Sequence, residues 1–261
     1  MSADRLYCIT HNGSPRHVVA RDGDARLLEG DAFGRYELGA EVALETSALL
    51  PPVRPSKVVA IGLNYRDHAA EMNKPLPAEP LMFMKPSTAV IGPGADIRLP
   101  MWAGEIHHEA EMAVVISRRA SRVGASDAMA HVLGIACAND VTARALQKQD
   151  VQYTRAKGFD TFAPLGPCVA LGLDPSSLGI EGLVNGTVRQ SSSTRELIFP
   201  VPELIAFVSR VMTLLPGDVI LTGTPSGVGP LTPGDTFTVR IEGVGELSNR
   251  AIADQALGPR L

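Results

Sequence analysis

Residues 107–116 read HHEAEMAVVI, with two carboxylates one residue apart at the head of an apolar run. The run is long enough only for a strand, and alternate side chains of a strand share one face, so Glu109 and Glu111 point the same way. Two like charges on one face are costly unless a positive group lies between them. A divalent cation fits, and magnesium fits best because it needs few carboxylates and keeps some waters. The alternative is an exposed strand face with two solvated glutamates.

A third carboxylate, Asp140, follows residues 133–139, which read LGIACAN. The apolar character and the small residues of this segment predict a buried strand. A carboxylate at the end of a buried strand lies where a sheet meets its loops, which is a common place for a functional site. Asp140 could instead cap a short helical turn over residues 141–147, and the sequence leaves both interpretations open.

Basic and amide side chains follow Asp140 closely along the chain. In the turn predicted over residues 141–147, Arg144 and Gln147 share a face because they are three residues apart. Lys157 stands just before an apolar loop rich in Gly and Pro, which predicts that its side chain is held in place. Arginine offers a bidentate fork and lysine a point charge. A metal site flanked by both predicts a receptor for a small carboxylate or an enolate.

These separated segments together resemble the fumarylacetoacetate hydrolase family, whose members cleave, decarboxylate or isomerise 2-oxo and 2,4-dioxo acids. The resemblance covers about residues 56 to 250 and rests on several motifs in the expected order. The motifs are IGLNY at 61–65 with His68 and Glu71, FMKP at 83–86, HEAE at 108–111, NDVTAR at 139–144 with Gln147, KGFD at 157–160, and LTGTPSGVGP at 221–230.

The resemblance implies a fold, a metal and a substrate class. The fold would be α+β but mostly β, a mixed β-sandwich or roll with few helices, and the protein would be a homodimer. Glu109, Glu111 and Asp140 would hold one Mg²⁺, for which Mn²⁺ or Ca²⁺ could substitute. The metal and Lys157 would stabilise the enolate that forms when a C–C bond of a small 2-oxo or 2,4-dioxo acid breaks. Arg144 would bind the substrate together with Gln147.

A short helix is predicted over residues 64–72, NYRDHAAEM, with His68 and Glu71 on one face. A carboxylate beside an imidazole orients the ring and favours its protonated form, a pairing suited to water activation or proton transfer. Taken alone, such residues are most often a surface pair. The resemblance implies a catalytic dyad on a lid that orders over bound substrate, with the proline-rich loop 73–80 as its hinge.

Residues 214–225, LLPGDVILTGTP, predict a turn, a strand and a Gly-rich bend. Glycines let backbone amides approach a ligand closely, and successive amides form a small anion receptor. By resemblance, Gly223 and Thr224 would contact the substrate carboxylate or the developing oxyanion. The alternative is a plain β-turn ribbon, since Gly227, Gly229 and Gly234 recur like the turns of hairpins.

One such site can serve several reactions. The predicted activity is magnesium-dependent cleavage of a C–C bond through a metal-bound enolate: hydrolysis of an acylpyruvate, decarboxylation of oxaloacetate, or both. The HHExE form and the lid dyad resemble that branch of the family. The KGFDTF run and the N-terminal segment resemble the alternative, the hydroxyheptadienedioate isomerase and decarboxylase of aromatic catabolism. A more distant alternative is a non-catalytic protein that binds metal and 2-oxo acid.

Composition excludes several classes of protein. With 261 residues, 45% hydrophobic and 20% charged, the chain is ordinary for a globular enzyme. A formal net charge of −4 gives no reason to expect nucleic acid or an anionic membrane as a partner. No run approaches the roughly 18 apolar residues that span a bilayer, and the start MSADR lacks the apolar core of a signal peptide. Three separated cysteines form neither a disulfide framework nor a zinc cluster, so we expect a cytoplasmic protein.

The chain divides at a proline-rich segment. Residues 1–50 carry short apolar alternations and predict a small β-rich unit. Residues 51–55, PPVRP, predict a linker, and the family motifs follow in a catalytic domain over residues 56–261. Two helices are predicted in that domain, over residues 125–131 and 202–213. The second has an apolar stripe formed by Leu204, Ile205, Val208, Val211 and Met212.

Overall fold

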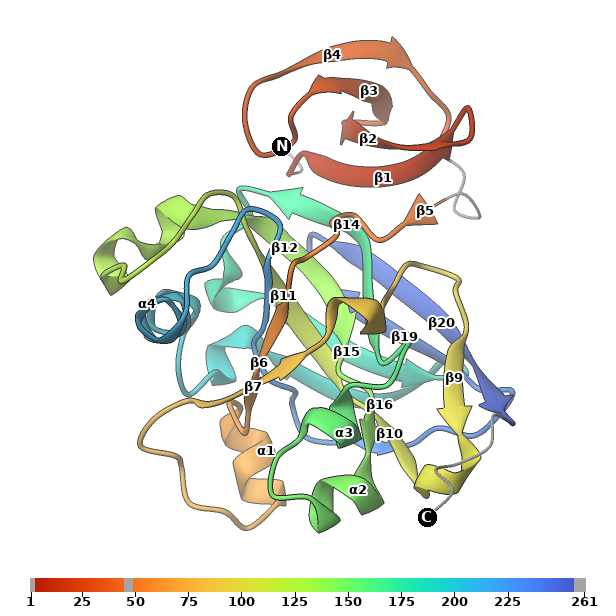
Figure 1. Ribbon diagram of the computed structural model, residues 1–261, viewed down its shortest axis with the longest axis vertical. Helices are drawn as coiled ribbons and strands as arrows, with labels where there is room; N and C mark the ends of the chain where they lie inside the picture. Colours follow the sequence, from red (N-terminus) through yellow and green to blue (C-terminus); the bar gives the residue numbers. More distant parts are fainter. Residues whose placement is uncertain (1–2, 45–48, 256–261) are drawn as a thin grey trace.

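The computed structural model describes residues 3–44 and 49–255. Residues 1–2 and 45–48 of the predicted N-terminal unit, and residues 256–261 of the predicted catalytic domain, lie outside the described residues. Strands predominate and the helices are short, as Figure 1 shows, so the prediction of a mostly β fold with few helices is confirmed. Within the described ranges, no helix is long and apolar enough to cross a membrane.

The main sheet runs from the N-terminal strands to the centre of the molecule. Its strands are β1 (Arg5–His11), β2 (Ser14–Arg21), β3 (Asp24–Gly30), β4 (Tyr36–Glu41), β5 (Leu49–Leu50), β6 (Val58–Gly62), β7 (Leu81–Lys85), β8 (Val90–Ile91), β11 (Ala110–Ile116), β12 (Val132–Asn139), β14 (Ala163–Leu171) and β17 (Val219–Leu221). They follow the order β4-β3-β2-β1-β14-β12-β11-β17-β6-β7, while β5 pairs with β1 and β8 with β14. Most neighbours are antiparallel, but β17 runs parallel to β6 and β8 parallel to β14.

Two smaller sheets complete the β structure. Their strands are β9 (Ile97–Pro100), β10 (Ile106–His108), β13 (Thr142–Ala143), β15 (Gly179–Val184), β16 (Thr187–Ser193), β18 (Gly229–Pro230), β19 (Thr236–Ile241) and β20 (Gly245–Asp254). One sheet has the order β16-β15-β19-β20-β9, and the other has the order β13-β10-β18. Strands β10 and β11 are thus consecutive in the chain but belong to different sheets.

The helices are few and short. The α-helices are α1 (Arg66–Glu71), α2 (Arg144–Gln149), α3 (Thr154–Lys157) and α4 (Val201–Val211), and 3₁₀ helices lie at Ser87–Ala89, Met101–Ala103, Ala125–His131, Pro175–Ser177 and Thr194–Glu196. Both predicted helices are present, α4 as an α-helix and residues 125–131 as a 3₁₀ helix. The predicted apolar stripe of α4 is wrong at Val211, which is 58% exposed. Val211 is the last residue of the helix and is not among its buried residues.

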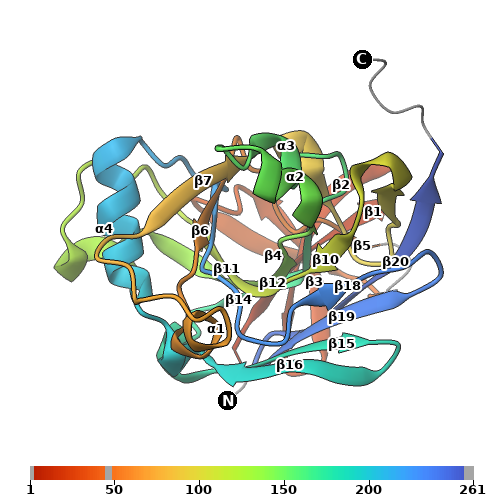
Figure 2. The ribbon, with the colours of Figure 1, turned by 90° about the horizontal axis from the view of Figure 1, so that it is seen from below.

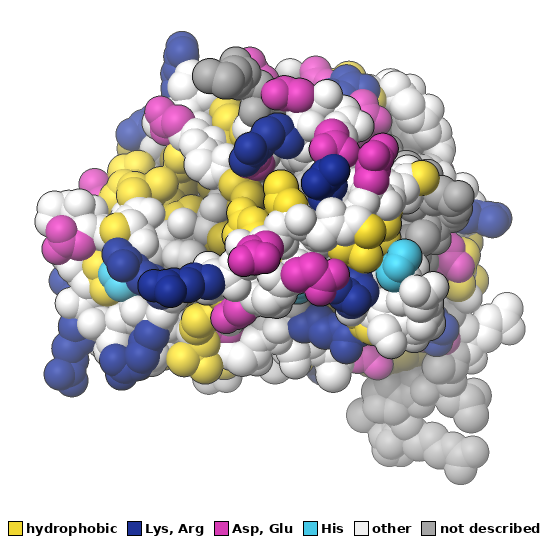
Figure 3. Space-filling model, turned by 90° about the horizontal axis from the view of Figure 1, so that it is seen from above, with side chains coloured by type: hydrophobic (Ala, Val, Ile, Leu, Met, Phe, Trp, Pro, Cys, Tyr) yellow, Lys and Arg dark blue, Asp and Glu magenta, His cyan; other side chains and the backbone are white. Residues whose placement is uncertain are grey.

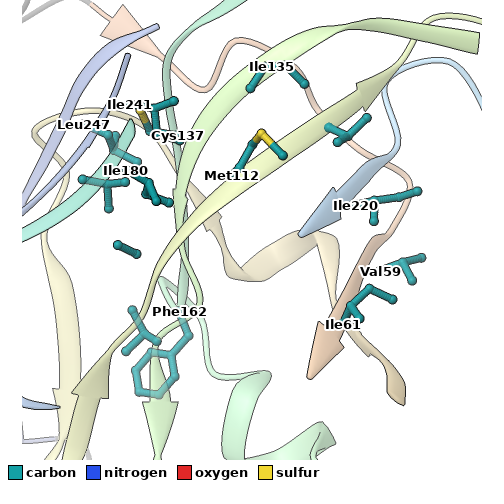
Figure 4. Packing of buried hydrophobic residues seen from close by; sticks show 14 of the residues in the cluster. Val59, Ile61, Met112, Ile135, Cys137, Phe162, Ile180, Ile220, Ile241 and Leu247 are labelled. Carbon is teal, nitrogen blue, oxygen red and sulfur yellow. The ribbon is translucent and has the colours of Figure 1, made fainter. Parts of the chain in front are cut away.

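The central strand β11 is buried on both faces, which explains why its sequence is a continuous apolar run. Met112 and Val114 belong to the larger core cluster, part of which Figure 4 shows. Ala113 and Val115 belong to a second cluster, which also contains Leu6 of β1. The strand that carries Glu111 is therefore fixed from two sides.

The N-terminal strands continue the main sheet at one end of the molecule (Figure 1), where Leu6 of β1 pairs with Val169 of β14. Figure 3 looks onto this end, and basic and acidic side chains are intermixed over the face that it shows. The division into a unit, a linker and a catalytic domain stays a prediction.

Three short helices gather at the opposite end. Helices α1, α2 and α3 lie at the end of the molecule that is farthest from the N-terminal strands (Figure 1). Seen from that end, α1 lies on one side of strands β6 and β11, and α2 and α3 lie on the other (Figure 2). The predicted site residues come from these helices and from the adjacent strand ends.

Candidate active site

Glu109 and Glu111 lie at the start of β11. The sequence predicted one strand through both residues, and this is wrong: β10 ends at His108 and β11 begins at Ala110, so Glu109 stands between them. The break arises because β10 pairs with β13 and β18, whereas β11 pairs with β12. Both side chains are nevertheless buried, with Glu109 4% and Glu111 1% exposed. The alternative of two solvated glutamates is therefore wrong.

Asp140 joins the two glutamates from the neighbouring strand. The predicted buried strand is confirmed as β12, which ends at Asn139, and Asn139 pairs with Ala110 of β11. Helix α2 begins after Ala143 with no side-chain cap, so the interpretation of Asp140 as a cap is wrong. Instead, one carboxylate oxygen from each of the three acidic residues lies within 4.8 Å of the others.

Lys157 lies between two of the carboxylates. Its Nζ donates to Glu109 Oε2 at 2.9 Å and to Asp140 Oδ2 at 2.5 Å. The residue closes α3 and is buried, which confirms that its side chain is held in place. Burial alone would lower the pKa of Lys157, but the carboxylates of Asp140 and Glu109 outweigh burial and raise it. Lys157 therefore remains an ammonium ion beside the carboxylates.

Lys85 is a second buried lysine, for which no role was predicted beyond its place in the FMKP motif. Its Nζ donates to Asp140 Oδ1 at 2.5 Å and to the carbonyl oxygen of Val141 at 3.2 Å. Burial lowers the pKa of Lys85, and the charge of Asp140 offsets this only in part. A signal was available in the sequence, because a lysine at the end of the apolar strand LMFMK is rarely buried without a charged partner.

Arg144 and Gln147 share one face of α2, as predicted. Arg144 Nη1 donates to Gln147 Oε1 at 2.7 Å, and Arg144 Nη2 lies 2.5 Å from Glu109 Oε1. The second contact is an ion pair by distance but is not aligned as a hydrogen bond, and Nη2 has no hydrogen-bond partner among the described residues. The guanidinium is thus oriented by two neighbours, and Arg144 lines the cavity that holds the carboxylates.

Glu111 is the one carboxylate of the three whose negative charge is not balanced by an ion pair with a described residue. The ion pairs of the described residues engage Glu109 and Asp140 but not Glu111. Burial, with the charges of Asp140 and Glu109, raises the pKa of Glu111 well above its usual range. Burial acts in the same direction on Glu109, but Lys157 and Arg144 outweigh it and hold the pKa of Glu109 low. An all-oxygen donor set with one uncompensated buried carboxylate fits a hard divalent cation.

The His68–Glu71 pair lies on the predicted short helix, which is confirmed as α1. His68 Nδ1 lies 3.0 Å from Glu71 Oε2, and Glu71 Oε1 accepts a hydrogen bond from the Gly227 amide at 3.0 Å. His68 lines the same cavity as the three carboxylates. His68 is therefore part of the cavity wall and Glu71 holds it from behind, while the role of the pair in a lid and in catalysis stays a prediction.

The Gly-rich bend lies against the head of β11. The Gly223 amide donates to Glu111 Oε2 at 2.8 Å, so the amide predicted to bind substrate already binds a carboxylate of the site. A φ of 100° at Gly223 favours glycine there. Thr224 Oγ1 donates to the carbonyl oxygen of Ala110 at 2.8 Å, and Thr224 lines the cavity. Contact of either residue with substrate stays a prediction.

The carboxylates open onto a cavity of about 510 Å³. All the predicted site residues line it except Glu71 and Gly223. Glu71 contacts His68, and Gly223 contacts Glu111. Apolar and cationic side chains complete the wall, among them Met72, Lys74, Leu81, Phe83, Lys148 and Val228. A larger cavity of about 640 Å³ lies among the N-terminal strands, but within the described ranges the only cluster of metal-ligating groups is the acidic one. We therefore place the site in the smaller cavity.

Comparison with known proteins identifies the family of this chain. Residues 57–252 match the family model described as Fumarylacetoacetate (FAA) hydrolase C-terminal. The chain is 44% identical over 220 residues to oxaloacetate tautomerase FAHD2A, mitochondrial, of Bos taurus, a match that covers 80% of this chain and 70% of that protein.

Two solved structures share the fold and are related in sequence. The 2-hydroxyhepta-2,4-diene-1,7-dioate isomerase from Mycobacterium marinum is 40% identical with a TM-score of 0.90, and the match covers 97% of this chain and 100% of that one. The maleylpyruvate hydrolase from Sphingobium sp. SYK-6, in complex with manganese (II) ion and pyruvate, is 29% identical with a TM-score of 0.78, covering 96% and 100%. The chain therefore belongs to the fumarylacetoacetate hydrolase family, whose members are enzymes that act on small molecules.

Proposed function

We propose that the protein is a magnesium-dependent enzyme that cleaves a C–C bond of a 2-oxo or 2,4-dioxo acid. The reaction would be hydrolysis of an acylpyruvate, decarboxylation of oxaloacetate, or both. The observation that carries the proposal is the convergence of three buried carboxylates with Lys157 and Arg144 on one cavity. A cation site beside fixed positive side chains suits a substrate in which a carboxylate adjoins a carbonyl.

Glu109, Glu111 and Asp140 would hold the metal, because their oxygens already converge. When bound, a divalent ion supplies Lewis-acid stabilisation of negative charge on the oxygens of the substrate. We propose Mg²⁺, with Mn²⁺ or Ca²⁺ as substitutes, and the manganese complex of the Sphingobium hydrolase supports a divalent ion in a site of this family. Turnover measured with each ion after removal of metal by a chelator tests the choice.

Lys157 and Arg144 would bind and orient the substrate. Lys157 is fixed by Glu109 and Asp140, so its ammonium group can stabilise negative charge that develops on the carbonyl oxygen as the C–C bond breaks. Arg144 is oriented by Glu109 and Gln147 and lines the cavity, so its guanidinium would bind the carboxylate of the substrate. Binding both groups would hold the bond to be broken in one orientation.

His68 would activate water for hydrolysis. Glu71 engages Nδ1 of the ring, and no hydrogen bond from the part of the chain that the structure describes engages Nε2. The ring is thus oriented and one nitrogen remains to take a proton from a water molecule in the cavity.

Replacing His68 with alanine should stop hydrolysis but spare decarboxylation, because loss of carbon dioxide needs no attack by water. We expect kcat for acetylpyruvate to fall by about 10²- to 10⁴-fold, the usual contribution of a general base. Release of carbon dioxide from oxaloacetate should change little. Steady-state kinetics on both substrates measure this, and an equal loss of both activities would mean that the dyad only closes the cavity.

A second candidate is proton transfer without C–C cleavage. The Bos taurus relative is named as an oxaloacetate tautomerase and the Mycobacterium marinum structure as an isomerase of a longer dicarboxylate, and these names favour tautomerisation or isomerisation at the same site. Such reactions need an enolate-stabilising site and a proton carrier, both of which the cavity offers. A protein that binds metal and 2-oxo acid without catalysis has less support, since the cavity is lined by both Lys157 and His68.

The first test is an assay with acetylpyruvate and, in parallel, with oxaloacetate, each with Mg²⁺ and then with a chelator. Loss of the enol absorbance of acetylpyruvate with Mg²⁺ alone, with formation of pyruvate and acetate, would support hydrolysis. Loss of the oxaloacetate enol without formation of pyruvate would support the tautomerase. No change with either substrate, from protein that binds Mg²⁺, would favour the isomerase and decarboxylase of a longer dicarboxylate.

A homodimer and a cytoplasmic location are also proposed, on the family resemblance and on composition respectively. Sedimentation or light scattering measures the mass of the particle, and fractionation of cells measures the location.

A further inference from the structure

Gln190 is a fully buried glutamine that joins three segments around the acidic cluster. It lies in β16 and makes four polar contacts with its carboxamide. Oε1 accepts from the Ala110 amide at 2.9 Å and lies 3.1 Å from His108 Nδ1. Nε2 donates to Thr224 Oγ1 at 2.8 Å and to the carbonyl oxygen of Pro225 at 2.9 Å. These contacts use both acceptor positions and both donors of the group.

The orientation of this carboxamide is determined by its backbone partners. The amide of Ala110 can only donate, and the carbonyl of Pro225 can only accept. If the carboxamide were flipped, its NH₂ group would face the Ala110 amide and its oxygen would face the Pro225 carbonyl, and both hydrogen bonds would be lost. With Oε1 as the acceptor, His108 Nδ1 must carry a proton and donate. A single arrangement therefore satisfies every partner.

Thr224 closes a ring of hydrogen bonds around Ala110. Its Oγ1 accepts from Gln190 Nε2 and donates to the carbonyl oxygen of Ala110. Strand β17 pairs with β11 only from Ala113 onward, so no paired strand of the main sheet reaches Ala110 on this side. The two side chains take the place of that strand and hold both backbone polar groups of the residue between Glu109 and Glu111.

Space for this arrangement depends on a glycine. Gly182 pairs with Gln190 across β15 and β16. A Cβ at Gly182 would lie 2.9 Å from Gln190 Oε1 and 3.1 Å from Ala110 Cβ, closer than side chains normally pack. The local chain thus leaves room for the glutamine against Ala110.

We propose that Gln190 and Thr224 form a positioning clamp that sets the relative placement of the Glu109 and Glu111 carboxylates for metal binding. The inference rests on the proposed metal site. Because the peptide groups on both sides of Ala110 are held, the backbone that carries Glu109 and Glu111 cannot shift at this point without breaking a buried hydrogen bond. Groups that orient metal ligands in this way commonly affect metal affinity as strongly as they affect activity.

The test is the affinity of the purified full chain for Mn²⁺, followed by the electron paramagnetic resonance signal of the free ion. Gln190→Met keeps the volume but removes all four contacts, and we expect Mn²⁺ to bind about 10- to 100-fold more weakly. A matched control is Asn249→Leu, since Asn249 is also a buried amide but donates to Gly92 and Ala95, away from the site. The control should lose stability without losing Mn²⁺ affinity.

Thr224 gives an independent test if Gln190→Met does not fold. Thr224→Val removes the hydroxyl at constant shape and should also weaken Mn²⁺ binding, whereas Thr224→Ser should restore it. Variants that are folded by circular dichroism and bind Mn²⁺ as tightly as the unmodified chain would overturn the clamp. Failure of the unmodified chain to bind Mn²⁺ would overturn the metal site itself, so the two failures are distinguishable.

Discussion

Replacing Glu111 with glutamine should abolish magnesium binding and turnover while the fold stays intact. Glutamine keeps the shape and an oxygen that can accept from the Gly223 amide, but it removes the charge that a hard cation requires. Metal ions supply several kcal/mol of charge stabilisation, so we expect turnover to fall by about 10³-fold or more. Calorimetric titration with Mg²⁺ and the acetylpyruvate assay measure the two losses.

The stability of this variant separates loss of function from loss of fold. Among the residues described, no ion pair engages Glu111, so removing its charge should leave the melting temperature unchanged or raise it. A suitable control is Glu246→Gln, which breaks an exposed ion pair with Arg240. This variant should change neither the turnover nor the melting temperature. Turnover that survives in Glu111→Gln with Mg²⁺ would refute the assignment of the three carboxylates.

Replacing Lys157 with methionine should cost both activity and stability. The change leaves Glu109 and Asp140 without the ammonium group that they share, and removal of one partner from a buried ion pair costs about 3–5 kcal/mol of unfolding free energy. Loss of a donor to developing negative charge should lower kcat by about 10²- to 10³-fold. Urea unfolding and kinetics at saturating substrate measure the two effects separately.

Lys85 offers a matched comparison for Lys157. Lys85→Met also removes a buried ammonium group from Asp140, so it should destabilise the fold to a similar extent. Lys85 does not line the cavity, however, whereas Lys157 does. We expect a clearly smaller loss of kcat for Lys85→Met, and equal losses would show that Lys157 acts on turnover only by holding Asp140.

The sequence predicts the parts of the site that local patterns determine. Alternating and continuous apolar runs locate β11 and β12, and therefore place Glu111 near the head of one strand and Asp140 just after the end of another. Spacing of three residues places His68 beside Glu71 and Arg144 beside Gln147 because α1 and α2 are helical. These predictions depend on backbone periodicity, which a single segment can reveal.

Other features depend on contacts between distant segments and could not be predicted in this way. The break at Glu109 arises because β10 and β11 pair with strands of different sheets. The contact of Lys85 with Asp140 joins residues 55 positions apart, and that of Gln190 with Ala110 joins residues 80 positions apart. The motif FMKP contained Lys85, but nothing in its spacing pointed to Asp140.

The burial of β11 on both faces affects how the protein should unfold. Leu6 of the N-terminal strand β1 shares a hydrophobic cluster with Ala113 and Val115, next to the strand end that carries Glu111. The N-terminal strands and β11 should therefore melt together in one cooperative transition, which calorimetry would show as equal calorimetric and van't Hoff enthalpies. Substitutions at Leu6, which does not line the cavity of the acidic cluster, would then lower the temperature at which activity is lost without changing the rate of turnover below that temperature.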